Sequence, residues 1–185
     1  MKQRKNMVTL RRITRADDPQ LESLLGLYVE SFPEEERRDL GQLRRMIPAV
    51  AEMQLCAIEH DGELAGLAVY WDMGEFYYME HLAVFPAMRN HKIGQQVLQW
   101  WQANLPKIQL LEVEPPTNPM AERRINFYRR NGLEVLEKSY VQPDYREDRD
   151  SCALWIMGTA PHPDLATYIR RIQDVAYREA RKYLR

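Results

Sequence analysis

HLAVFPAMRNHKIGQQVLQWW, residues 81–101, is the stretch that decides the fold. Its first part is apolar and stops at Pro86, as a buried strand does. The polar turn RNHKIG follows, and then Ile93, Val97 and Trp101 recur at the spacing of one helical face. The stretch therefore predicts a strand, a turn and an amphipathic helix whose apolar face packs against a sheet.

The turn before this helix has the chemistry of an anion site. The N–H groups at a helix start have no intrahelical acceptor, and the helix dipole adds positive potential there. Gly94 lacks a Cβ, so a ligand can approach the main chain, and Arg89 and Lys92 can pair with phosphate oxygens. We therefore expect a phosphate pocket here, although short glycine-containing turns before helices also occur in many unrelated α/β proteins.

Two motifs together resemble the GNAT superfamily, the acyl-CoA-dependent N-acetyltransferases. The first comprises Val84, Pro86, Arg89 and Gly94. Lys92 stands where the family usually has its first glycine, and a lysine in the right-handed region would still donate its N–H. The second motif matches the order and spacing of the family's later helix and comprises Phe127, Tyr128, Gly132 and Leu133. The resemblance spans roughly residues 7–158.

The resemblance implies an α/β fold with a mixed, mostly antiparallel sheet of about seven strands flanked by helices. It also implies acetyl-CoA as co-substrate, and a main-chain N–H near residues 82–84 as the oxyanion donor where the fourth strand splays from the fifth. The residues implied to bind the cofactor are Leu82, Ala83, Val84, Arg89, Asn90, His91, Lys92, Ile93, Gly94 and Gln95.

Acetyl transfer to an amine needs a base for the ammonium and an acid for the departing thiolate. Glu80 is the candidate base, because a carboxylate in an apolar strand is costly unless hydrated or paired, and it resembles the strand glutamate of several family members. A glutamate wetted at a strand edge is the alternative. Tyr128 is the candidate acid by resemblance, and a core tyrosine facing the sheet with Ile125 is its alternative. His81, on the opposite strand face, is expected to be packed or hydrogen-bonded.

These residues imply an enzyme that moves an acetyl group from acetyl-CoA to a primary amine by direct attack in a ternary complex. A non-catalytic acyl-CoA sensor or interaction module on the same fold is the alternative. The acceptor would be a small-molecule or peptide amine. Seven acidic residues are expected near the entry for the acceptor, where they would favour a cationic amine. The alternative is that they are solvated surface. They are Glu34, Glu35, Glu36, Asp144, Glu147, Asp148 and Asp150. Tyr140, Gln142 and Tyr145 could line the same cleft.

Composition is consistent with one domain over residues 1–185, since the chain has 185 residues of which 45% are hydrophobic. Residues 1–6 are expected to be a solvated tail. The formal net charge of −1 argues against nucleic acid as a partner. Without a membrane-spanning run or a signal peptide, we expect a cytoplasmic protein with no membrane partner. The four histidines lack metal-ligand spacing, so no metal is expected.

The two cysteines, Cys56 and Cys152, lie in predicted strands and are expected to be small buried residues rather than a disulfide or a nucleophile. The expected strands are residues 7–14, 53–60, 63–73, 75–85, 108–114, 133–143 and 151–157.

Helix signals are also distinct. Asp17 or Asp18 is expected to cap a first helix that Pro33 ends, and the acids of EEERRDLGQLRRMI to start a second helix that Pro48 closes. Asn118 with Pro119 should begin the helix that Gly132 ends. A further helix is expected within residues 163–185, either packed on its own domain or paired across a homodimer.

Overall fold

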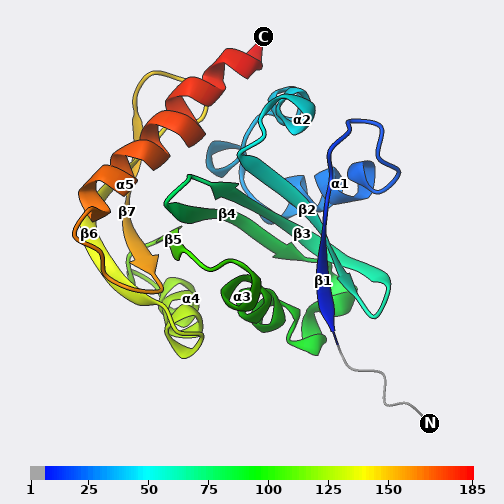
Figure 1. The fold of residues 1–185 in the computed structure, drawn as a ribbon, viewed down its shortest axis with the longest axis horizontal. Helices are drawn as coiled ribbons and strands as arrows, with labels where there is room; N and C mark the ends of the chain where they lie inside the picture. Colours follow the sequence, from blue (N-terminus) through cyan, green and yellow to red (C-terminus); the bar gives the residue numbers. More distant parts are fainter. Residues whose placement is uncertain (1–6) are drawn as a thin grey trace. The chain divides into compact units, whose positions relative to one another are not determined.

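The computed structural model describes residues 7–185, and the expectation of a tail at residues 1–6 lies outside them. Seven strands form one sheet in the order β1-β2-β3-β4-β5-β7-β6 (Figure 1). The strands are β1 (Val8–Arg12), β2 (Met53–His60), β3 (Glu63–Asp72), β4 (Phe76–Val84), β5 (Ile108–Val113), β6 (Glu134–Pro143) and β7 (Asp150–Gly158). β4 and β5 pair in parallel, whereas β1–β2, β5–β7 and β6–β7 pair antiparallel. The predicted mixed, mostly antiparallel sheet is therefore confirmed.

The α-helices are α1 (Leu21–Ser31), α2 (Leu40–Ala49), α3 (Ile93–Asn104), α4 (Pro119–Arg130) and α5 (Leu165–Arg171). The chain forms two compact units. The first consists of the described residues up to Tyr70 together with His81–Pro106, and the second of Trp71–Glu80 and Lys107–Arg185. The expectation of a single domain over residues 1–185 stays a prediction. Among residues 7–185, no helix combines the length and the apolar character needed to cross a bilayer.

In the first unit, β2 and β3 form the predicted hairpin. Asp61 and Gly62 at its turn have φ values of 52° and 86°. Both are left-handed, as a two-residue turn that matches the twist of the strands requires. Gln20 is the N-cap residue of α1, and Asp18, two residues before this cap, accepts a hydrogen bond from Gln20 N at 3.0 Å. The carboxylate of Asp18 also accepts from the guanidinium of Arg11 at 2.8 Å, so neither Asp17 nor Asp18 is the cap.

The second helix begins later than the sequence indicated. Glu34–Glu36 form only a short 3₁₀ turn, η1, and α2 starts at Leu40. The carboxylate of Asp39 accepts from Gln42 N at 2.9 Å, and the backbone of Asp39 is not helical. Asp39, rather than one of the preceding glutamates, is therefore the N-cap residue of α2. Pro48 lies inside the last turn of α2, where its fixed φ is compatible with the helix. The helix therefore ends one residue beyond the predicted end.

In the second unit, α4 begins and ends as predicted. The Asn118 side chain accepts from Ala121 N at 2.9 Å, and Pro119 is the first helical residue. At the other end, Gly132 has φ 86° and Leu133 N donates to Tyr128 O at 3.1 Å. This bond closes the last turn, and it requires the left-handed backbone that glycine adopts without cost.

The C-terminal segment follows α5 as a π-helical stretch, Ile172–Arg178 (η3), and a 3₁₀ stretch, Glu179–Leu184 (η4). Its buried side packs within the second unit. The Tyr168 ring stacks on Phe76 with centroids 4.4 Å apart, and the Tyr177 hydroxyl lies 2.9 Å from that of Tyr78. Packing of the helix on its own domain is thus supported within this unit, and pairing across a homodimer stays a prediction.

Candidate functional site

The predicted anion turn of the first unit consists of a 3₁₀ stretch, η2 (Pro86–His91), Lys92 and the start of α3. Lys92 has φ 55° and ψ 30°, which is left-handed, so the right-handed conformation considered from the sequence is wrong. A left-handed residue with a side chain costs about 1–2 kcal/mol, and glycine is the usual occupant. Lys92 therefore adopts the backbone conformation that glycine favours, at the position where the family usually has its first glycine.

The start of α3 offers main-chain donors. Gln96 N donates to Lys92 O at 3.1 Å, so the N–H groups of Ile93, Gly94 and Gln95 precede the helical hydrogen-bond ladder and point along its axis. The Ile93 side chain is only 1% exposed, which fixes the first turn against the core. Such a helix start attracts anions.

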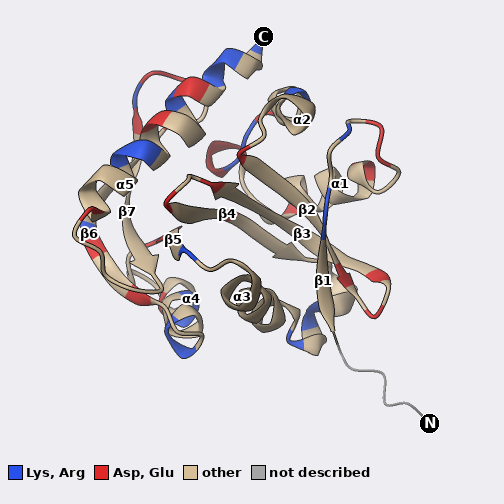
Figure 2. Ribbon diagram, in the orientation of Figure 1, with Lys and Arg blue, Asp and Glu red and all other residues tan. Residues whose placement is uncertain are grey.

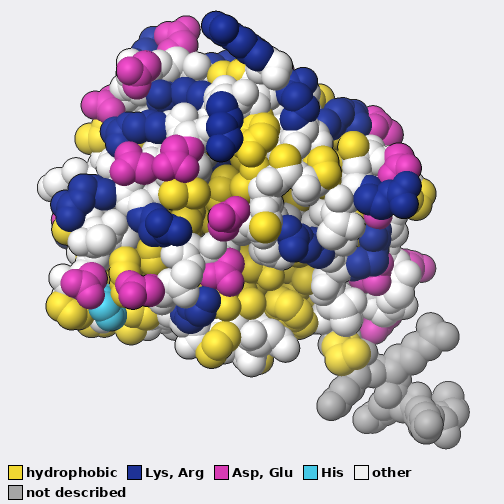
Figure 3. All heavy atoms as spheres, turned by 45° about the horizontal axis from the view of Figure 1, so that its top comes forward, with side chains coloured by type: hydrophobic (Ala, Val, Ile, Leu, Met, Phe, Trp, Pro, Cys, Tyr) yellow, Lys and Arg dark blue, Asp and Glu magenta, His cyan; other side chains and the backbone are white. Residues whose placement is uncertain are grey.

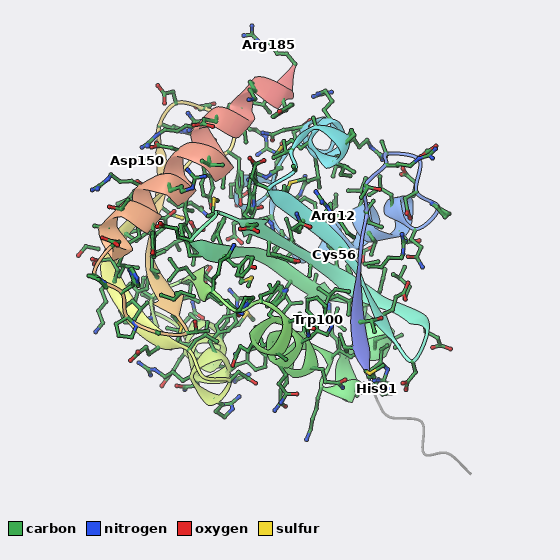
Figure 4. The ribbon with its side chains drawn as sticks, in the orientation of Figure 1. Arg12, Cys56, His91, Trp100, Asp150 and Arg185 are labelled. Carbon is green, nitrogen blue, oxygen red and sulfur yellow. The ribbon has the colours of Figure 1, made fainter. Side chains whose placement is uncertain are left out.

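The polar residues of the turn surround these donors on the surface. Arg89, Asn90, His91 and Lys92 are exposed, and His91 lies at the end of η2 (Figure 4). Arg89 Nε donates to Val84 O at 3.3 Å, which holds this charge beside the end of β4. The turn therefore combines two cations with the helix start.

The end of β4 is held closely by β3. Phe85 N donates to Ala65 O at 2.9 Å. A Cβ on Gly66 would lie 2.2 Å from Ala83 O, so no other residue fits there without moving β4. Gly66 was not singled out in the sequence, and it positions the main chain of the predicted cofactor strand.

His81 is packed and hydrogen-bonded, as predicted. Its ring lies 5.0 Å from that of Tyr28 and 4.4 Å from that of Phe32, and its Nε2 lies 3.1 Å from Glu36 O. Its exposed fraction is 7%.

In the second unit, the side chain of Glu80 is held at both oxygens. Its Oε2 accepts from the indole Nε1–H of Trp71 at 2.7 Å, and its Oε1 accepts from the hydroxyl of Tyr145 at 3.0 Å. Trp71 and Tyr145 are buried, whereas Glu80 is half-buried. Glu80 is therefore a paired carboxylate with a fixed orientation. Its role as a base stays a prediction.

Glu80 and a second glutamate follow the ladder between β4 and β5. The registered pairs run from Phe76–Ile108 to Met79–Leu111. The next residues are Glu80 in β4 and Glu112 in β5. Because paired residues of parallel strands point to the same face, this register directs both carboxylates to one side of the sheet.

Glu112 lies in a buried polar cluster that the sequence interpretation missed. Its carboxylate accepts from the hydroxyl of Tyr140, from Gln142 Nε2 at 2.8 Å and from the hydroxyl of Tyr177 at 2.7 Å. Burial raises the pKa of the Glu112 carboxyl, although these hydrogen bonds act in the opposite direction. The available signal was the one used for Glu80, a single carboxylate within an apolar strand.

The sequence predicts Tyr140 and Gln142 as possible lining of an acceptor cleft. They are 2% and 8% exposed and donate to Glu112, and a place beside an acceptor stays a prediction. Tyr145, considered with them, is 2% exposed and contacts Glu80. Tyr140 and Gln142 therefore hold the carboxylate of Glu112, and Tyr145 holds that of Glu80.

The acids of the loop between β6 and β7 are largely paired. Asp144 accepts from Arg146 N at 2.7 Å and Glu147 N at 3.0 Å and forms an ion pair with Arg149 at 3.3 Å. Burial raises the pKa of Asp144, but these partners lower it more, so it lies below the usual value. Lys/Arg and Asp/Glu side chains are also intermixed on the face in Figure 3. These contacts favour solvated surface over an acidic mouth for this loop.

Tyr128, on α4, is half-buried. Within residues 7–185 its hydroxyl has no hydrogen-bond partner, and burial raises the pKa of the phenol. A phenol with a raised pKa keeps its proton at neutral pH and can donate it. Ile125, one turn earlier, is 2% exposed, so the helix face that both residues share is partly in the core.

Cys56 is buried in β2, as predicted (Figure 4). Cys152 is exposed, so the expectation for it was wrong. The pairs between β7 and β5 run from Trp155 to Gly158, and Cys152 lies before them. Its position in a strand therefore did not bring burial. In the described part of the chain, no group of three or more His, Cys, Asp or Glu residues could hold a metal ion.

Comparison with known proteins identifies the family. The model of the acetyltransferase (GNAT) domain matches residues 51–135. A solved structure from Bacteroides thetaiotaomicron, assigned to the GNAT family, is 35% identical, with a TM-score of 0.86 over 91% of this chain and 98% of that chain. No match is found among curated proteins.

Two more distant structures show the same fold. Naa50 of Arabidopsis thaliana, in complex with the bisubstrate analogue CoA-Ac-MVNAL, is 18% identical, with a TM-score of 0.52 over 83% of this chain and 98% of that chain. A GNAT acetyltransferase from Elizabethkingia anophelis with acetyl-CoA bound is 16% identical, with a TM-score of 0.52 and the same two coverages. Together with the match to the Bacteroides protein over nearly its whole length, these findings show that the chain belongs to the GNAT acetyltransferase family.

Proposed function

We propose that this protein is an acyl-CoA-dependent N-acetyltransferase that transfers the acetyl group of acetyl-CoA to a primary amine. The observation that carries the proposal is the left-handed Lys92 before α3, which gives a turn with free helix-start donors and two cations in a GNAT chain. The Elizabethkingia acetyltransferase, of the same fold, has acetyl-CoA bound.

The proposed cofactor site uses charge and main chain. The N–H groups at the start of α3, with Arg89 and Lys92, would bind the pyrophosphate of acetyl-CoA. The main chain of residues 82–84 would pair with the pantetheine arm, since the registered β4–β5 ladder stops at Met79. The proposed contacts are Leu82, Ala83, Val84, Arg89, Asn90, His91, Lys92, Ile93, Gly94 and Gln95.

In the proposed reaction both substrates bind together and react directly. Glu80 accepts a proton from the ammonium, directly or through water, and the neutral amine attacks the thioester carbonyl carbon. A main-chain N–H near residues 82–84 stabilises the resulting oxyanion. The C–S bond then breaks, Tyr128 gives its proton to the thiolate, and the proton that the new amide nitrogen loses restores the Tyr128 phenol through water. The raised pKa of Tyr128 supports this role, because the phenol is protonated before the step.

The proposed acceptor is a small-molecule or peptide amine. Naa50, which shares the fold, was solved with an analogue that joins CoA to a peptide. The pairing of Asp144 and Asp148 with arginines removes much of the argument for a strongly cationic acceptor.

The test is isothermal titration with CoA and acetyl-CoA, followed in the same samples by thiol release on addition of a panel of amines. We expect micromolar binding and amine-dependent release. Arg89→Gln should weaken binding, whereas Arg170→Gln, which removes an exposed charge on α5, should not. Absence of binding would contradict the anion turn. Tight binding without release across the panel would contradict turnover and favour an acyl-CoA sensor on the same fold.

A further inference from the structure

The orientation of Glu80 depends on two donors from distant parts of the chain. Trp71, on β3, donates to Oε2 at 2.7 Å, and Tyr145, in the loop between β6 and β7, donates to Oε1 at 3.0 Å. A glutamate side chain has three rotatable bonds. Donors on both oxygens fix the plane of the carboxylate as well as its place.

The loop that carries Tyr145 is stabilised by hydrogen bonds between its own residues. Asp144 Oδ1 accepts from Arg146 N at 2.7 Å and from Glu147 N at 3.0 Å, and Asp144 N donates to Arg149 O at 2.9 Å. A carboxylate that binds the N–H groups two and three residues later stabilises a turn. Tyr145 thus lies inside a defined turn.

The C-terminal segment also binds this loop. Arg181 donates to Asp144 O from Nε at 3.2 Å and from Nη2 at 2.9 Å, and its Nη1 forms an ion pair with Asp148 at 3.0 Å. The Arg181 side chain is only 15% exposed and its two bonds to Asp144 O are partly buried, whereas Asp148 is exposed. One turn earlier, the ring of Tyr177 lies 4.8 Å from that of Tyr145.

Arg181 differs from its neighbours along the segment. Basic and acidic residues follow one another there (Figure 2). Arg178 pairs locally with Asp174 at 2.6 Å and is about half exposed, at 46%. A local, exposed pair contributes little, whereas the three donors of Arg181 connect two segments. Arg178 is therefore a matched control for Arg181.

From these contacts we propose that Tyr145 is a positioning residue for Glu80, and that the C-terminal segment, through Arg181 and Tyr177, sets the place of Tyr145. The proposal rests on the proposed role of Glu80 as the base. The C-terminal segment, which follows the last strand, then supports the proposed base.

The indole N–H of Trp71 provides a direct readout, because it donates to the carboxylate in question. In a ¹H–¹⁵N spectrum, the Trp71 resonance, assigned with Trp71→Phe, should shift as Glu80 titrates. Glu80→Gln should abolish that titration. Glu112 also lies near these aromatic side chains, so a titration that persists in Glu80→Gln and disappears in Glu112→Gln would belong to Glu112.

Tyr145→Phe removes one donor from the carboxylate without removing the ring. Because a hydrogen-bond donor favours the charged form of the carboxylate, we expect the midpoint of the Trp71 indole titration to rise by about one pH unit. Arg181→Gln should move it in the same direction by a smaller amount, and Arg178→Gln should leave it unchanged. An unchanged midpoint in Tyr145→Phe, with the titration still dependent on Glu80, would overturn the proposal. Equal shifts in Arg181→Gln and Arg178→Gln would overturn the part that involves the C-terminal segment.

Kinetics separates this inference from the proposed function. The kcat of the parent and of Tyr145→Phe is measured against pH with an amine that the panel identifies. The midpoint pH of the acidic limb should rise in Tyr145→Phe by the same amount as the midpoint of the indole titration, while the KM for acetyl-CoA stays constant. An acidic limb that persists in Glu80→Gln would refute Glu80 as the base. The spectroscopic titration would still decide whether Tyr145 positions the carboxylate, so the two failures are distinguishable.

Discussion

Replacement of Lys92 by glycine should stabilise the protein and weaken its binding of CoA. Lys92 has φ 55° and ψ 30°, a conformation that costs an L residue about 1–2 kcal/mol and costs glycine almost nothing. Glycine also has more conformational freedom in the unfolded chain, which reduces the stabilisation by about 0.4–1 kcal/mol. The net stabilisation should be about 0.5–1 kcal/mol.

The side chain of Lys92 is exposed at the start of α3, so its removal costs few contacts. Lys92→Ala is the matched control, because it removes the same charge and keeps a Cβ in the left-handed region. For a chain of this size, 1 kcal/mol corresponds to a change in Tm of about 2–4 °C. Lys92→Gly should therefore melt up to about 4 °C higher than the parent, whereas Lys92→Ala should melt at or below it.

Urea unfolding and thermal melts measure the stability, and titration with CoA measures the lost charge. Both variants should bind CoA more weakly and to a similar extent, because both lack the cation that faces the proposed phosphate site. If glycine and alanine change the free energy of unfolding equally, Lys92 is not left-handed and the geometry of the turn is incorrect. Unchanged affinity in both variants would exclude Lys92 from the phosphate site.

Three further predictions concern single side chains. Tyr128→Phe should lower kcat about 10- to 1,000-fold with little change in acetyl-CoA affinity, and equal turnover would exclude Tyr128 from the mechanism. In the folded protein at pH 8 a thiol reagent should modify Cys152 and spare Cys56, whose pKa burial raises to about 12; rapid modification of both would contradict this. The pKa of Glu112 is raised by folding, so its stabilising contribution is present below the unfolded pKa and is lost as pH rises through the folded pKa. The stability of Glu112→Gln relative to the parent, from urea unfolding, should therefore improve from about pH 4 to pH 8, and a constant difference would contradict the burial of the charge.

Local signals predicted the elements whose physics is local. The Asp61–Gly62 turn, the Asn118 cap and the Gly132 helix end each depend on backbone angles or hydrogen bonds within a few residues. The start of α2 was misplaced because two candidate caps compete. The acids of η1 suit a helix start, but Asp39 binds Gln42 N and places the start later.

The backbone at Lys92 could not be read from its residue type. Lysine is uncommon in the left-handed region, and the choice follows from the turn that joins β4 to α3. The exposure of Cys152 was similarly hidden, because a strand residue is buried only if its neighbours cover it. The ladder to β5 begins at Trp155, after Cys152.

The two strand glutamates show most clearly where sequence reasoning stops. Glu80 and Glu112 follow equivalent positions of one parallel ladder, and each interrupts an apolar strand. Their donors come from residues 9 and 65 positions away for Glu80 and 28 to 65 positions away for Glu112, which no local pattern contains. Burial raises the pKa of Glu112, whereas the hydrogen bonds that its carboxylate accepts lower it. Glu80 is half-buried like Glu112 and is held at both oxygens, and its role as the base stays a prediction.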